Sequence, residues 1–146
     1  MSPEENKAIA RRWFEEGFNG HNLEVFGELA AEDFVQHTAT TLPGMTGGRA
    51  GNMQTVAMVF AAFPDWHVSV EDMIAEGDKV VTRYTEHGTQ RGEFMGIPAT
   101  GKTVTITGIE IMRCADGKIA EQWIEGNALG MMQQLGVIPA PGHAPS

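Results

Sequence analysis

The hydrophobic period of the chain changes near Pro64, and this change limits the possible folds more than any other feature of the sequence. Before Pro64, apolar residues recur three or four positions apart, as they do along one face of an α-helix. After Pro64 they alternate with polar residues, which is the period of a β-strand with one buried face. Helices followed by strands within one domain, residues 1–146, predict an α+β fold.

Three helices are expected in the first part of the chain. The first begins at Ser2-Pro3, because serine caps a helix and Glu5 completes a capping box, and it ends at Asn19-Gly20. A shorter helix follows, and a third covers about residues 49–63. The predicted apolar faces are Ile9, Ala10, Trp13, Phe14, Gly17 and Phe18 in the first helix, Leu23, Phe26 and Leu29 in the second, and Met53, Val56, Val59, Phe60 and Phe63 in the third.

The remaining segments predict strands and loops. Residues 32–37 look extended, residues 40–48 are rich in turn formers, and residues 139–146 form a Pro- and Gly-rich flexible tail. Strands are expected at residues 66–75, 80–89 and 103–114, and after the hairpin turn Asp116-Gly117, with a short amphipathic helical turn at the end. We therefore expect a cone-shaped roll, in which a curved, mainly antiparallel sheet packs against about three N-terminal helices around a central cavity.

Charge and composition exclude several classes of partner. The net charge of −9 disfavours nucleic acid and anionic membrane surfaces, which are themselves negatively charged. No apolar run approaches the roughly 18 residues of a membrane-spanning helix. The five histidines lack the paired spacings of a metal site, and residues 44–51 lack the Lys-Ser/Thr end of a phosphate-binding loop. We expect no metal and no cofactor, and the single cysteine, Cys114, indicates a cytoplasmic location.

Several segments resemble one known family. The segments lie at residues 18–37 and 63–89, followed by GIPATGK (96–102), GIEIMR (108–113), DGKIAEQW (116–123) and QQLG (133–136). In this order, over about residues 5–139, they resemble the SnoaL-like polyketide cyclases, or ester cyclases, of the nuclear transport factor two-like superfamily. The resemblance implies a homodimer and an intramolecular aldol ring closure that needs neither cofactor nor metal.

The resemblance also assigns site positions. In the characterised cyclases an aspartate on the last strand is the general acid/base, and a histidine on the preceding strand lies near the substrate. Matched to this chain, the aspartate position is Ile124 and the histidine position is Glu110. Many relatives keep His and Asp where this chain has Gln122 and Asn127. The acid of the last strand is therefore absent here.

Glu110 is the first candidate for catalysis, because it shares the strand parity of the apolar residues Val104, Ile106 and Met112. If this side chain is buried, desolvation raises its pKa and suits it to proton transfer near neutral pH. The alternative is a structural ion pair with Arg83 or Arg113.

His37 is the second candidate for catalysis. It ends the extended segment 32–37, in which the related ketosteroid isomerases hold their proton-abstracting carboxylate, and histidine is a suitable acid/base at pH 7. The alternative is a histidine that only hydrogen-bonds the following loop.

The last strand supplies further ligand-binding candidates. Gln122 and Asn127 can orient a substrate carbonyl but cannot transfer protons, and Ile124 would add an apolar side chain to the wall of the cavity. The resemblance implies that Gln122 and Ile124 face the cavity. A bulge near Gly126 would reverse the alternation there, so that Glu125 would face the cavity instead. The other expected ligand contacts are Tyr84, Arg83, Phe14, Phe18, Phe34, Met53, Phe60, Trp66 and Met112.

The sequence thus predicts a cofactor-independent enzyme that binds a small apolar or aromatic carbonyl compound. Glu110 would be its acid/base and His37 a helper. A hydrolase or dehydratase, such as an epoxide hydrolase, is an alternative that requires Glu110, a second acid and Arg83 in the cavity. A non-catalytic binding protein is another, and it requires a closed or wholly apolar cavity without a perturbed titratable group.

Overall fold

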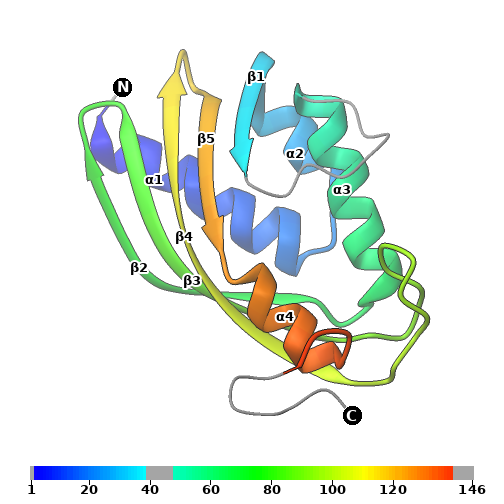
Figure 1. Ribbon diagram of the computed structural model, residues 1–146. Coiled ribbons are helices and arrows are strands. Elements are labelled where there is room, and N and C mark those ends of the chain that lie inside the picture. The colour runs from blue at the N-terminus through cyan, green and yellow to red at the C-terminus, as the bar shows by residue number, and fades with distance from the viewer. Residues whose placement is uncertain (1, 39–47, 140–146) are drawn as a thin grey trace.

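The computed structural model describes residues 2–38 and 48–139, so most of the expected loop at 40–48 and of the expected tail at 139–146 lies outside the described residues. The order of elements matches the change of period (Figure 1). The helical segments are α1 (Pro3–Arg12), the π-helix η1 (Trp13–Asn19), α2 (Leu23–Leu29), α3 (Gly48–Ala62) and α4 (Ala128–Leu135). The strands are β1 (Ala30–Thr38), β2 (His67–Glu76), β3 (Lys79–Thr89), β4 (Thr103–Ala115) and β5 (Lys118–Gly126).

The strands form one five-stranded sheet in the order β1-β5-β4-β3-β2. Strands β2 to β5 make an antiparallel meander, and β1 adds to the edge of β5 in parallel. The sheet curves around α1 and η1, while α2 and α3 lie beside β1 and α4 lies at the other end of β5 (Figure 1). The prediction of an α+β roll with a curved, mainly antiparallel sheet is confirmed. The parallel pairing of β1 was not predicted.

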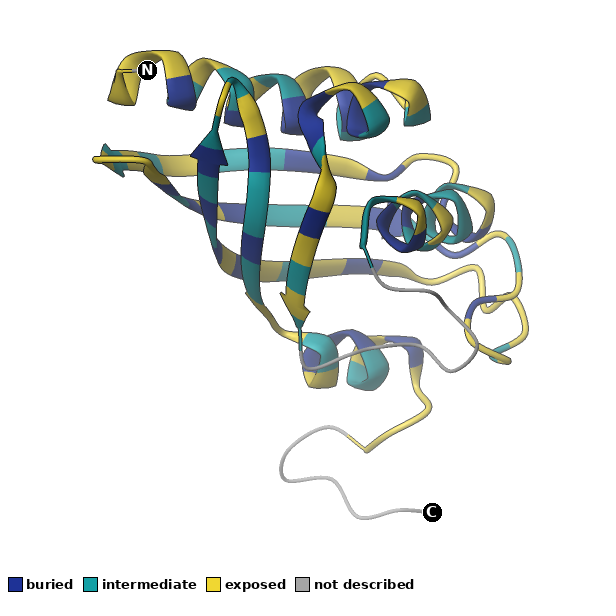
Figure 2. Ribbon diagram, turned by 90° about the horizontal axis from the view of Figure 1, so that it is seen from above, coloured by how far each residue is buried: buried dark blue, intermediate teal, exposed yellow. Residues whose placement is uncertain are grey.

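The first helix begins as the capping box predicts. The Glu5 backbone N–H donates to Ser2 Oγ over 3.1 Å, and the Ser2 N–H donates to Glu5 Oε1 over 3.2 Å. From Trp13 the helix continues as the π-helix η1, which ends at Asn19 as expected. Gly17 in η1 allows the next helix to approach closely, because a Cβ there would lie 2.7 Å from the ring of Phe26. The buried residues of these helices face the sheet, while their exposed residues face outward (Figure 2).

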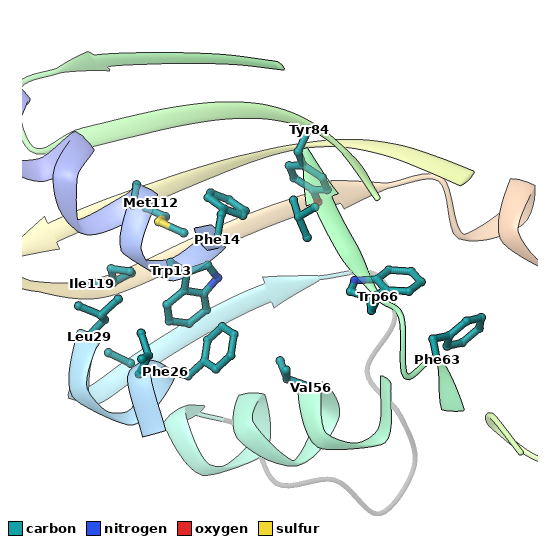
Figure 3. Close-up of a cluster of buried hydrophobic side chains, with 14 of the residues drawn as sticks. Trp13, Phe14, Phe26, Leu29, Val56, Phe63, Trp66, Tyr84, Met112 and Ile119 are labelled. Atoms are coloured by element: carbon teal, nitrogen blue, oxygen red, sulfur yellow. The ribbon is translucent and has the colours of Figure 1, made fainter. Parts of the chain in front are cut away.

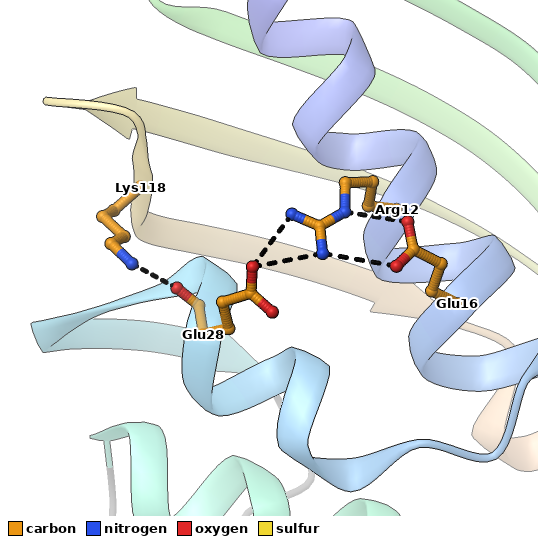
Figure 4. A network of polar contacts seen from close by, with 4 residues as sticks. All are labelled: Arg12, Glu16, Glu28 and Lys118. Carbon is orange, nitrogen blue, oxygen red and sulfur yellow. Dashed lines mark hydrogen bonds and ion pairs between the residues drawn. The ribbon is translucent and has the colours of Figure 1, made fainter.

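A polar network links the outer surfaces of these elements (Figure 4). Arg12 Nε donates to Glu16 Oε2 over 2.8 Å, and Arg12 Nη1 donates to Glu28 Oε1 over 3.2 Å. Lys118 at the start of β5 donates to the backbone carbonyl of Glu28. Each exposed contact of this kind contributes little to stability, and together the contacts connect α1, α2 and the start of β5.

The hydrophobic core extends between the sheet and the helices as one cluster of buried side chains. Trp13 packs edge-on against Phe26, with ring centroids 4.6 Å apart. Met112 and Ile119 lie at one end of the cluster, and Trp66 and Phe63 lie at the other (Figure 3). Aromatic packing of this kind adds about 0.5–1.5 kcal/mol per pair beyond the burial of surface.

Helix α4 confirms the short helical segment that the sequence predicts after the last strand. It follows β5 and packs beside β4. The Thr105 backbone N–H donates to Gln134 Oε1 over 2.7 Å, and Gln134 Nε2 donates to the Thr105 carbonyl over 2.8 Å. The side-chain amide thus satisfies the two backbone groups that a neighbouring strand would otherwise pair. This contact holds α4 beside the open end of the roll.

A buried glutamine organises the loop between β3 and β4. Gln90 Nε2 donates to the carbonyls of Gly92 and Ile97, and Thr100 Oγ1 donates to Gln90 Oε1 over 2.7 Å. These bonds satisfy a glutamine that has no exposed surface. As a result the loop folds inward and places Phe94 against the core.

Candidate active site

A cavity of about 260 Å³ lies between the concave face of the sheet and the helices. This volume is slightly below the roughly 300–1,000 Å³ of common small-molecule sites, so it suits a compact ligand. Most of the described lining is apolar, and the polar groups come from the inner faces of the strands, from Asn52 on α3, and from Trp66 and Asn127 next to strand ends. The described lining residues are Trp13, Phe14, Phe18, Gln36, Thr38, Asn52, Val59, Trp66, Tyr84, Glu86, Phe94, Ile106, Glu110, Gln122, Ile124, Glu125, Gly126, Asn127, Ala128 and Met131.

Glu110 lies on the inner face of β4, as its strand parity predicts. Its neighbours across the strands are Thr82 on β3 and Ile124 on β5, and only 4% of the residue is exposed. Burial raises the pKa of Glu110 to about 8, because the carboxylate loses its hydration; the charge of Glu86 raises the pKa further, while a hydrogen bond from Gln122 opposes it. Glu110 is therefore mainly protonated at neutral pH.

A chain of side-chain amides holds one oxygen of Glu110. Gln122 Nε2 donates to Glu110 Oε2 over 2.9 Å, and Gln36 Nε2 donates to Gln122 Oε1 over 3.0 Å and to Asn52 Oδ1 over 3.1 Å. Gln36 therefore donates to both of its neighbours, and on one side the donation continues through Gln122 to Glu110. Glu110 Oε1 and Asn52 Nδ2 remain at its ends, both buried and both without a partner among the described residues.

Two aromatic residues add polar atoms to the wall. The Trp66 Nε1–H is buried and has no hydrogen-bond acceptor within the described part of the chain. Tyr84 lies over Gly108, where a Cβ would be 2.5 Å from the tyrosine hydroxyl oxygen. Burial, followed by the charges of Glu110 and Glu86, raises the pKa of Tyr84, so this hydroxyl keeps its proton. The polar atoms of this wall are thus mainly hydrogen-bond donors at neutral pH.

Glu86 is a lining residue that the sequence analysis missed. It lies on the inner face of β3, and burial alone raises its pKa to about 7. The signal was present in the sequence, because Glu86 has the parity of Val80 and Tyr84 within a strand that was correctly predicted. Gln36 and Asn52 were missed as well, and no local pattern points to them.

Eight of the expected site residues line the cavity. Strand β5 turns Gln122 and Ile124 inward, as the resemblance implies, and Glu125 also reaches the rim, where the chain leaves the sheet. Asn127 borders the cavity, but its Oδ1 accepts the Gly130 N–H over 2.9 Å as the cap of α4. The eight residues are Phe14, Phe18, Trp66, Tyr84, Glu110, Gln122, Ile124 and Asn127.

His37 and Arg83 lie outside the cavity lining, because strand alternation places them on the outer face. His37 Nε2 is 2.6 Å from Glu121 Oε2, and its ring stacks on Trp123 with centroids 5.3 Å apart. Arg83 is exposed and borders a shallow depression around Gly108 and Gly126. The structure therefore does not bring either residue together with Glu110.

Four further expected contacts belong to the packing around the site rather than to its wall. Phe34 and Met112 are buried in the core, with 2% and 0% exposure. Met53 and Phe60 are partly buried against the core, and Phe60 stacks on His21 with centroids 4.4 Å apart. The alternation of buried and exposed residues was therefore predicted correctly, but not which buried residues border empty space.

The described residues hold no group of three His, Cys, Asp or Glu side chains that could bind a metal ion. Among the same residues, no helix is both long enough and apolar enough to cross a membrane.

Comparisons with known proteins agree with this fold. IdmH of Streptomyces antibioticus, a candidate polyketide cyclase, is 35% identical, with a TM-score of 0.75 over 90% of this chain and 98% of that chain. A candidate SnoaL-like polyketide cyclase from Jannaschia species CCS1 is 27% identical, with a TM-score of 0.80 over 95% and 98% of the two chains. TsrD of Streptomyces laurentii, at 24% identity, shares the fold with a TM-score of 0.83 over 94% of this chain and 99% of that chain.

No curated protein matches. The sequence model of the SnoaL-like polyketide cyclase family matches residues 8–135 of this chain. The chain therefore belongs to the SnoaL-like polyketide cyclase family.

Proposed function

We propose that this chain binds a compact, largely apolar carbonyl compound and closes a ring in it by proton transfer, as an intramolecular aldol reaction without a cofactor. The family and its related structures support a cyclase- or isomerase-like function that acts on a small molecule. The observation that carries the proposal is Glu110, a carboxylic acid that is protonated at neutral pH and holds an unpartnered oxygen in an apolar cavity.

Glu110 acts as the acid of the reaction. Its Oε1–H donates to the carbonyl oxygen of the substrate and transfers its proton as negative charge develops there. Gln122 holds the other oxygen and so fixes the direction of the acid. In a dry site, a placed acid of this kind contributes roughly 10²- to 10⁴-fold to the rate.

Other lining residues orient the substrate. The unpartnered N–H groups of Asn52 and Trp66 offer donors to further oxygen atoms, and Ile124 supplies apolar wall. Gln122 supports Glu110 rather than the substrate, since both ends of its amide are already bonded. Asn127 shapes the rim as the cap of α4.

The two alternatives from the sequence receive less support. An epoxide hydrolase of the expected type needs Arg83 between two acids, and Arg83 lies outside the described lining although Glu86 supplies a second acid. A non-catalytic binding protein would not need two cavity carboxyls whose pKa values burial raises toward neutrality. Homodimerisation stays a prediction, supported by exposed Ile109 and partly exposed Trp123 on the outer face of the sheet.

The experiment measures enolisation, the first half of an aldol reaction. Proton NMR in D₂O follows hydrogen–deuterium exchange at the carbons next to the carbonyl of β-tetralone, a bicyclic ketone. We expect exchange above the buffer rate, and at least about a hundredfold less exchange in Glu110→Gln. Circular dichroism checks that the variant is folded, and Glu71→Gln on the exposed part of β2 is the control. A Glu110→Gln variant that keeps most of the exchange rate contradicts the proposal.

A further inference from the structure

Glu86 is the second carboxyl of the cavity, and no structural contact explains it. It makes no hydrogen bond or ion pair with the described residues. Its neighbours across the sheet are Val68 on β2 and Ile106 on β4, both apolar. Glu86 is half-buried, and a carboxyl that loses water among apolar neighbours destabilises a fold unless a partner compensates, so its place at the cavity wall points to a ligand.

We propose that Glu86 is a catalytic residue of this site, the base that removes a proton from the carbon next to the carbonyl group that Glu110 protonates. The substrate class follows from this assignment: a carbonyl compound with an acidic C–H bond, bound with its oxygen toward β4 and that C–H toward β3. The inference rests on the proposed function and adds the second half of its proton transfer.

The two strands place both acids on one inner face. Tyr84 pairs with Gly108, Thr82 pairs with Glu110 and Glu86 pairs with Ile106, so the two glutamates are four residues apart along paired strands, roughly 13 Å between backbone positions. No side chain beyond Cα occupies Gly108 between them, and Tyr84 lies over it. The two carboxyls thus border the same cavity on either side of Tyr84, which also lines it, so a ligand that reaches both carboxyls lies against the Tyr84 ring.

The charges around the pair favour opposite protonation states. Burial raises the pKa of Glu86 to about 7, while burial and then the charge of Glu86 raise that of Glu110 to about 8. The other titratable groups of the described lining are Tyr84 on β3, which keeps its proton, and Glu125 on β5. Helices η1, α3 and α4 contribute only uncharged residues to the described lining. Between these two pKa values, one carboxylate and one carboxylic acid coexist.

The protons balance over one reaction. The Glu86 carboxylate takes the carbon-bound proton, the C–H electron pair forms the C=C bond of the enol, and the carbonyl oxygen takes the proton of Glu110. The enol carbon then bonds to a second carbonyl carbon, and that carbonyl's oxygen takes the proton from Glu86. The enol O–H proton returns to Glu110 as its C=O bond re-forms, so both acids regain their starting states.

The test compares Glu86→Gln and Glu86→Leu with Glu110→Gln and the control Glu71→Gln. The first readout is the pH profile of β-tetralone exchange. The second is carboxyl ¹³C NMR titration of protein labelled at glutamate Cδ, which needs no ligand. We expect a wild-type maximum between about pH 7 and pH 8, with the rate rising as Glu86 ionises and falling as Glu110 ionises.

Both Glu86 variants should lose at least about a hundredfold in exchange rate, and their pH profiles should lack the rise at lower pH. Their ¹³C spectra should lack the Glu86 carboxyl resonance, which titrates near pH 7 in the wild-type protein. A folded Glu86 variant that keeps its rate and its rising side overturns the inference, as does a Glu86 resonance that titrates at an ordinary pH. If Glu110→Gln loses activity in that case, the proposed function stands without Glu86. If Glu110→Gln also keeps its rate, the proposed function fails as well.

Discussion

The buried acids should make the protein less stable as the pH rises from about 4.5 to about 8, and Glu110→Gln should remove most of this effect. The pKa values of Glu86 and Glu110 are raised above 4.5 in the folded protein, to about 7 and about 8. Between 4.5 and these values the folded state holds protons that the unfolded chain has released. The free energy of unfolding therefore falls as the pH increases through this range.

The size of the effect follows from the pKa values. At about 1.4 kcal/mol per pH unit and per proton, Glu110 lowers the free energy of unfolding by about 2.5 kcal/mol between about pH 6 and pH 8.5. Glu86 adds about 1.5 kcal/mol, so the wild-type protein loses about 4 kcal/mol. Exposed carboxyls with lowered pKa values, such as Glu16 and Glu121, are ionised throughout this range in both states and contribute no slope.

Urea unfolding, followed by the fluorescence of the three tryptophans, measures these free energies at several pH values. Glutamine at position 110 can still accept the hydrogen bond from Gln122 but has no proton to lose. The variant should therefore show a decline of only about 1.5 kcal/mol over the same range, due to Glu86. Equal slopes in wild type, Glu110→Gln and the control Glu71→Gln would show that Glu110 is ionised at ordinary pH and would refute the reasoning.

Two further predictions concern the wall of the cavity and its end. Gly108→Ala should destabilise the protein by about 1–3 kcal/mol in urea unfolding and weaken β-tetralone binding, because the new Cβ would lie 2.5 Å from the Tyr84 hydroxyl oxygen. Gly126→Ala is its matched control for stability, since nothing lies within 4 Å of a Cβ there; an equal loss of stability in both variants would contradict this account. Gln134→Ala should destabilise by about 1–2 kcal/mol and speed amide hydrogen exchange at Thr105, because both backbone bonds to Thr105 are lost. Its control is Gln133→Ala, and unchanged exchange at Thr105 in Gln134→Ala would show that the amide does not hold α4.

Local patterns of the sequence were sufficient to predict most elements and the direction of Glu110. A capping box and a turn are set by a few neighbouring residues, so the start of α1 and the hairpin at Asp116-Gly117 could be predicted. Strand parity depends on the same short range, and it placed Glu110 on the apolar face of its strand, whereas the inward direction of Gln122 came from the family resemblance. The same rule, applied to β3, would also have identified Glu86.

Contacts between distant segments could not be predicted in this way. β1 pairs with β5 across more than 80 positions, and this pairing brings Gln36 opposite Gln122. Asn52 reaches the same chain of amides only because α3 packs beside β1. His37 shows the same limit, because the parallel register that turns it outward toward Glu121 has no signal in its own segment.

The register also explains how a chain that lacks the family's acid at position 124 still has an acid at the same place in the cavity. The resemblance assigns the acid of SnoaL-like cyclases to the position of Ile124, and Ile124 pairs directly with Glu110 on the neighbouring strand. Directly paired residues on one face of antiparallel strands have Cβ atoms about 4.5–5.5 Å apart, so an acid moved between them still borders the same cavity. What raises its pKa is the loss of water around it, which both positions share. The apolar wall of the cavity, more than the strand that carries the acid, therefore decides whether proton transfer is possible here.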